Sequence, residues 1–181
     1  MKPAAVTQAQ GLADAAAPRR RSVRHYRSLA KGFHWLTAAL VLALVASGVI
    51  MKQLSEGSVA DTLFSLHKLI GALTLTVVLI RLSYRFTGLE PAGVVSYRRP
   101  TVHWMLYGII VLVPLLGWAG VSDFGAREIF LGYSLPAIWP EGAGYADLLL
   151  SIHAYLAFAL LGLVALHIGN ALQDYMMRAR E

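Results

Sequence analysis

Apolar residues along this chain gather in four long blocks, which are separated by shorter and more polar stretches. The blocks cover residues 34–51, 63–82, 102–121 and 148–172. Each block is long enough for one crossing of a bilayer, which takes about 20 residues in a helix. Backbone polar groups inside lipid need internal partners, so the blocks are predicted to be helices. The pattern therefore predicts an all-α fold, a transmembrane four-helix bundle.

The polar stretches suggest how the chain is divided. Residues 1–30 are rich in Ala and Gln and then in Arg, without apolar periodicity, so we expect a basic, mobile tail. Residues 31–175 form the predicted bundle, and residues 176–181 form a short polar end. The segment 122–147 is expected to lie on the membrane surface or to cap the bundle. No second domain is expected.

Composition and charge support a membrane protein and predict its orientation. The chain is 57% hydrophobic and only 14% charged. Thirteen of its sixteen Lys and Arg residues lie before the first block, around the connection between the second and third, or after the fourth. The positive-inside rule places that side, with both termini, in the cytoplasm, and we expect a bacterial inner membrane. The basic residues are concentrated in the segments on one side of the predicted bundle. The net charge of +6 therefore indicates a protein that contacts membrane lipid, and we expect no nucleic-acid partner.

The fourth block carries two histidines, His153 and His167, which are fourteen residues apart. An ionisable side chain inside a membrane span is costly, and it therefore suggests a functional role. Fourteen residues make close to four helical turns, so both imidazoles leave the same side of the helix, roughly 21 Å apart along its axis. Two separate histidines, each hydrogen-bonded to a neighbouring helix, explain this block equally well.

The same spacing recurs in two other spans. Fourteen residues after His34 comes Gly48, and fourteen residues after His67 comes Arg81. Gly71 lies one turn from His67 on the same face. Glycines at such positions leave room for a flat group, or simply for close packing of two helices.

Successive spans cross in opposite directions, so the four histidines fall at two depths. His67 and His153 lie toward the outer side, whereas His34 and His167 lie toward the inner side. A low-spin haem takes two axial nitrogens from facing helices, and residues at one depth can share an iron. This pairing predicts two haem b groups with bis-His ligation, an outer one and an inner one.

Two charged residues accompany the predicted haem sites, and other uses of the histidines remain open. Arg81 falls at the inner depth and Lys68 adjoins the outer pair, where each would meet haem propionates or lipid headgroups. Zinc or copper sites and a proton relay are the alternatives. The cores of the spans hold no Asp or Glu, and the chain has no cysteine. Haem therefore fits better than a zinc cage or a relay, and c-type attachment is excluded.

At these residues the chain resembles the bacterial cytochrome b561 family of four-helix, di-haem b proteins of the inner membrane. The resemblance covers about residues 30–175 and implies that the haem ligands are His34, His67, His153 and His167. Arg81 matches a family arginine on the second span. The matching stretches are FHW at 33–35, SLHKLIGALTLTVVLIRL at 65–82, YGIIVLVPLLG at 107–117 and IHAYLAFALLGLVALH at 152–167.

The resemblance implies electron transfer between quinone and a second partner. In superoxide oxidase-like members, superoxide is oxidised at the periplasmic side and ubiquinone is reduced. Asp174 stands where such members carry a histidine linked with the quinone site, and His103 and Asn170 are further candidate substrate contacts near the inner face. Lys68, with Lys52 and Arg127, would attract the superoxide anion.

Two other functions remain open at this point. The first is a haem-b electron-transfer subunit that links a partner dehydrogenase, a hydrogenase or a periplasmic carrier to the quinone pool. The second is a membrane scaffold without a cofactor. An enzymatic oxidoreductase of the superoxide:quinone type is the interpretation that we carry forward.

Overall fold

The structure is a computed structural model, which describes residues 30–86, 100–130 and 132–179. It contains four long helices, each long and apolar enough to cross a membrane. The prediction of an all-α bundle of four spans is confirmed, and the described residues form no strand beyond one isolated bridge. The helices are, in chain order, Ala30–Met51 (the first helix), α2 (Ser58–Phe86), α3 (Pro100–Phe124) and α4 (Ala146–Arg178).

Hydroxyl side chains inside the spans are satisfied mostly by the helix that carries them. Thr74 Oγ1 donates to the carbonyl of Ile70, and Ser83 Oγ donates to the carbonyl of Leu79. Such bonds keep polar groups paired where lipid offers no partner, so these residues do not interrupt the helices. Pro114 also lies within α3, which continues to Phe124.

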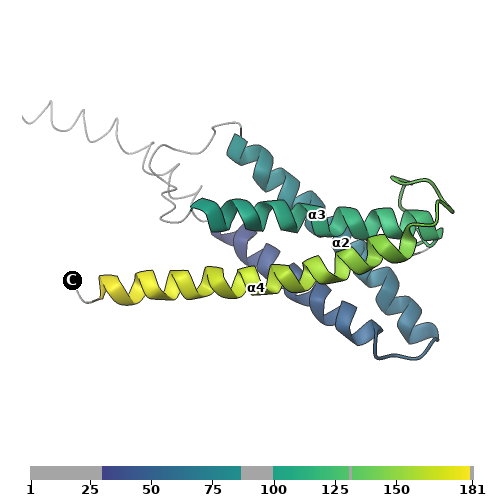
Figure 1. Cartoon of the computed structure of the whole chain (residues 1–181), viewed down its shortest axis with the longest axis horizontal. Helices are drawn as coiled ribbons and strands as arrows, with labels where there is room; N and C mark the ends of the chain where they lie inside the picture. The colour runs from purple at the N-terminus through teal and green to yellow at the C-terminus, as the bar shows by residue number, and fades with distance from the viewer. Residues whose placement is uncertain (1–29, 87–99, 131, 180–181) are drawn as a thin grey trace, which may run out of the picture.

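The antiparallel helices α3 and α4 pack more closely with each other than α2 packs with α3, and they run side by side in Figure 1. The first helix and α2 cross this pair at an angle. Large apolar side chains are exposed along all four helices, as suits surfaces that face lipid. The buried interior is small, and its apolar members are Val41, Leu75, Val77, Val78, Val113, Ala119, Val121 and Leu160.

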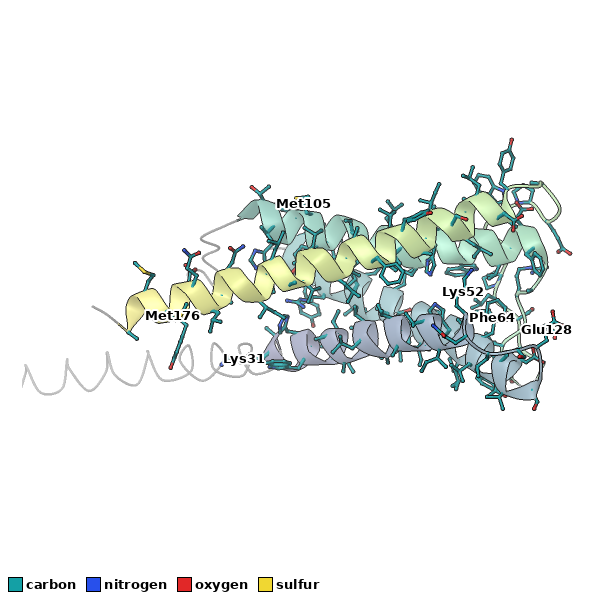
Figure 2. The ribbon with its side chains drawn as sticks, turned by 60° about the horizontal axis from the view of Figure 1, so that its bottom comes forward. Lys31, Lys52, Phe64, Met105, Glu128 and Met176 are labelled. Carbon is teal, nitrogen blue, oxygen red and sulfur yellow. The ribbon has the colours of Figure 1, made fainter. Side chains whose placement is uncertain are left out.

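The two ends of the bundle differ in the segments that they carry. Figure 2 shows Lys31, Met105 and Met176 toward one end, which we call the terminal end because the first helix begins there and α4 ends there. Lys52 and Glu128 lie at the opposite end, which we call the loop end because it carries the connection between α3 and α4. The expected tail over residues 1–30 lies almost entirely outside the described residues.

Asp123 stabilises the loop end through hydrogen bonds to the connection between α3 and α4. Its side chain is buried, and its two carboxylate oxygens accept the backbone N–H groups of Gly144 and Tyr145, at 3.1 and 2.6 Å. Its own carbonyl accepts the N–H of Gly142 at 2.9 Å. Trp118 Nε1 donates to the carbonyl of Pro136 in the same connection. The connection is therefore tied to the end of α3, and Asp123 determines where α4 begins.

Candidate functional site

At the loop end, His67 on α2 and His153 on α4 face each other. Their ring centroids are 6.0 Å apart, and the ring planes are inclined by 77°. Both side chains are partly buried. We call these two residues the loop-end pair. They are the histidines that the depth argument placed together at the outer side.

The orientation of His153 is determined by α3. His153 Nδ1 lies 2.8 Å from the carbonyl oxygen of Val113, which only accepts hydrogen bonds. Nδ1 therefore carries the proton, and the lone pair of Nε2 is left for another partner. Gly117 makes this approach possible, because a Cβ there would lie only 2.9 Å from Nδ1 and 3.0 Å from Cε1 of His153.

The orientation of His67 is determined by the first helix. His67 Nδ1 lies 2.9 Å from Ser47 Oγ, and Ser47 Oγ also lies 2.9 Å from the carbonyl oxygen of Leu44. Gly48 follows directly, and a Cβ there would lie 3.5 Å from Cε1 of His67. Gly48 therefore lies beside His67.

At the terminal end, His34 on the first helix and His167 on α4 form a second pair. Their ring centroids are 6.2 Å apart, and the ring planes are inclined by 60°. We call these two residues the terminal-end pair. Because fourteen residues separate His153 from His167, the two pairs lie roughly 21 Å apart along α4.

Two further side chains gather around the terminal-end pair. His103 on α3 stands perpendicular to His167, with ring centroids 5.0 Å apart. Arg81 on α2 is partly buried, within electrostatic range of both His34 and His167. Its guanidinium carbon lies 5.9 Å from the ring centre of Tyr107. The terminal end therefore combines three imidazoles with one permanent positive charge.

Lys68 contacts the connection between α3 and α4. Its Nζ donates to the carbonyls of Ala126, at 2.8 Å, and Glu128, and it stands 4.5 Å from the ring centre of Phe64. The amine is thus engaged with the connection between α3 and α4. Sequence reasoning had assigned it to a propionate or a headgroup.

The remaining predicted residues take up peripheral positions. Asn170 and Asp174 are partly buried on α4, in the turns that follow His167. A Cβ at Gly71 would lie 4.0 Å from Leu44 Cδ2, so this glycine faces the first helix. Arg127 forms an ion pair of 3.2 Å with Glu141 within the loop-end connection.

Comparison with known proteins identifies the family to which this chain belongs. Residues 25–176 match the family described as prokaryotic cytochrome b561. The chain belongs to the prokaryotic cytochrome b561 family. Membership implies a multi-pass inner-membrane protein that binds haem b and transfers electrons.

Two relatives of this cytochrome b561 chain match most of its length. Cytochrome b561 homolog 2 of Escherichia coli (strain K12) is 27% identical in an alignment 161 residues long, which covers 84% of this chain and 85% of the relative. A probable superoxide oxidase CybB of Yersinia pestis is 24% identical in an alignment 162 residues long, which covers 86% of this chain and 92% of the relative. No solved structure matches the chain significantly.

Sequence reasoning missed three residues that shape this cytochrome b561 bundle. Ser47 contacts His67, Gly117 admits His153, and Asp123 caps α4. A hydroxyl within an otherwise apolar span was the available signal for Ser47. Asp123 lies in the polar segment 122–147, where a carboxylate is ordinary, and nothing in the one-dimensional pattern links Gly117 to a histidine on another helix.

Proposed function

We propose that this protein is a di-haem b cytochrome that carries electrons from superoxide at the periplasmic side to ubiquinone at the cytoplasmic side. The observation that carries the proposal is the presence of two facing histidine pairs at two depths of one bundle. The loop end, which has few basic residues, would face the periplasm. The basic segments beside the terminal end would face the cytoplasm.

The spacing of the imidazoles fits an iron between them. With metal–nitrogen bonds of about 2 Å and about 1 Å more to each ring centre, two imidazoles on opposite sides of a metal have centroids about 6 Å apart. The pairs are separated by 6.0 and 6.2 Å. No group of three His, Cys, Asp or Glu side chains suited to a bare metal ion occurs among the described residues. Haem supplies four ring nitrogens itself, so two protein ligands suffice.

The hydrogen bonds of the loop-end pair also support haem binding. Histidine ligands commonly donate their other ring nitrogen to an oxygen, which fixes the tautomer and makes the ligating nitrogen more basic. Val113 supplies such an oxygen to His153, and Ser47 supplies one to His67. In this proposal His67 and His153 bind one iron, and His34 and His167 bind the other.

Haem b, when bound, supplies one-electron redox chemistry at each depth. Two superoxide anions each lose one electron and become dioxygen, and one ubiquinone gains both electrons and two protons. The histidine pairs would hold one haem group each, at two depths of the roughly 30 Å of hydrocarbon. Lys52 is exposed at the loop end, where its charge would favour approach of the anion.

Residues at the terminal end would bind the haem edge and the quinone. Arg81 stands where its charge would pair with propionates of the haem held by His34 and His167. His103, Asn170 and Asp174 would contact the quinone headgroup. His103 and Asp174 are both able to exchange a proton, which reduction of a quinone to a quinol requires.

The test follows superoxide decay and quinone reduction by the purified protein, together with haem quantified per chain. We expect two low-spin b haems per chain and a superoxide decay that depends on added quinone. The His67→Ala variant should bind one haem per chain and should no longer accelerate superoxide decay. His25→Ala is the matched control, because His25 belongs to neither pair, and it should behave as the wild type.

The outcomes separate the candidate functions. Wild-type protein with two haems that does not accelerate superoxide decay would refute superoxide as donor. Haem reduction that occurs only with a co-purifying partner would then favour an electron-transfer subunit for a dehydrogenase, a hydrogenase or a periplasmic carrier. Colourless protein from cells supplied with ample haem would remove the redox function altogether.

A further inference from the structure

The two members of the loop-end pair form the hydrogen bond at Nδ1 with different kinds of group. For His153 the partner is the backbone carbonyl of Val113, which every amino acid at that position would provide. For His67 the side-chain partner is Ser47, on a different helix, and the backbone carbonyl of Leu44 on that helix also acts on the ring. One substitution therefore removes the hydroxyl partner of His67 while the chain keeps its backbone bonds.

The hydroxyl of Ser47 has one proton to donate, and a backbone carbonyl is in position to receive it. Ser47 Oγ lies 2.9 Å from the carbonyl oxygen of Leu44, one turn earlier on the first helix, and this oxygen only accepts. With its proton used there, Oγ accepts from Nδ1–H of His67, which lies 2.9 Å away. His67 then has the same tautomer as His153, with the lone pair on Nε2.

We infer that Ser47 is a positioning residue for the haem at the loop end: its hydroxyl holds the tautomer of His67 and strengthens the nitrogen that binds iron. The inference rests on the proposed function, because it requires a haem between His67 and His153. A hydrogen bond accepted from Nδ1–H increases electron donation by the imidazole, and stronger donation stabilises the oxidised iron. Ser47 therefore lowers the reduction potential of this haem, which favours onward transfer of an electron toward the terminal-end pair.

The test uses redox titration of the full-length protein with both haems bound, followed by absorbance and electron paramagnetic resonance. The variants are Ser47→Ala, which removes the hydroxyl, and Ser47→Thr, which keeps one. Ser83→Ala is the matched control. Ser83 Oγ also donates to a carbonyl of its own helix, but Ser83 lies near the C-terminus of α2, sixteen residues after His67. The His34→Ala variant, which keeps the loop-end pair, assigns the titration steps to the two haems.

In Ser47→Ala we expect an upward shift of the potential of the loop-end haem and a changed resonance signal from its iron. The terminal-end haem should keep its potential, and Ser47→Thr should restore the wild-type values. Loss of the loop-end haem from Ser47→Ala alone, with recovery in Ser47→Thr, would equally support a positioning role.

Two results would overturn the inference. One is an unchanged potential and resonance signal of the loop-end haem in Ser47→Ala. The other is an equal disturbance in Ser47→Ala and Ser47→Thr, which would show that packing matters and the hydroxyl does not. Wild-type protein that binds no haem at the loop end would refute the proposed cofactor arrangement itself, so the two failures are distinguishable.

Discussion

At the scale of single residues, the histidine pairs depend on side chains that are small or absent. In a helix, the side chain four residues after a carbonyl lies close to it and limits lateral access. Gly117 follows Val113 by one turn, and its missing Cβ leaves the carbonyl of Val113 open to His153. A polar bond between two membrane helices is possible here only because one of them carries glycine at this point.

Gly117→Ala should displace His153. The added Cβ would meet Nδ1 of His153 at 2.9 Å, so the imidazole must move and its bond to Val113 must break. Haem content should fall from two per chain toward one, measured by the haem-to-protein ratio. Gly108→Ala on the same helix is the control, because a Cβ there meets nothing within 4 Å. Two haems retained in Gly117→Ala would contradict this account of the site.

At the scale of elements, the connection between α3 and α4 is organised by groups at its two borders. The side chain of Tyr145, at the start of α4, makes no capping hydrogen bond. The buried carboxylate of Asp123 at the end of α3 instead accepts the N–H groups that precede α4. A capping contact between helices makes the start of α4, and with it the height of His153, depend on α3.

Asp123→Ala should lower the free energy of unfolding by about 1 to 2 kcal/mol, because it removes a cap and leaves backbone donors unpaired. Denaturant unfolding in detergent measures the loss, and hydrogen exchange should increase around residues 142–149. Glu56→Ala, which changes an exposed carboxylate at the same end, should leave both measurements close to wild type. Equal stabilities of the two variants would show that the cap contributes little.

Lys68→Met should loosen the connection between α3 and α4 without removing haem. The substitution keeps an apolar side chain beside Phe64 but loses the bonds to the carbonyls of Ala126 and Glu128. Faster amide exchange over residues 126–135, at constant haem content, is the expected result. Lys52→Met, at an exposed position of the same end, is the control. Haem loss specific to Lys68→Met would instead favour the propionate contact that the sequence suggested.

At the scale of the whole molecule, function depends on which end faces which compartment. Most basic residues precede the first helix, accompany the connection between α2 and α3 or follow α4, and the proposed direction of electron transfer follows from the positive-inside rule. The natural chain contains no cysteine, so single cysteines introduced by mutation report orientation without background.

Tyr133→Cys should be labelled by a membrane-impermeant maleimide in intact spheroplasts, and Ala179→Cys should be labelled only after lysis. Tyr133 lies in the loop-end connection and is 71% exposed, whereas Ala179 is exposed just after α4. The unmodified chain serves as the unlabelled control. Labelling of Ala179→Cys alone in intact spheroplasts would reverse the orientation and with it the assignment of donor and acceptor sides.

The sequence by itself determined the number of spans and the depth of each histidine. Both properties are local: hydropathy selects the segments that cross, and a rise of about 1.5 Å per residue converts spacing into depth. The pairing of His67 with His153, and of His34 with His167, therefore follows from the sequence. Haem binding by these pairs stays a prediction until a spectrum is recorded.

Only the tertiary structure decided which groups surround the pairs. The contacts of Ser47 with His67, of His103 with His167 and of Lys68 with the loop depend on how each helix is rotated and tilted against its neighbours. Spans that are apolar on all sides carry little information about that rotation, because lipid and helix interior are equally apolar. Close packing and buried hydrogen bonds, formed once the helices meet, determine it.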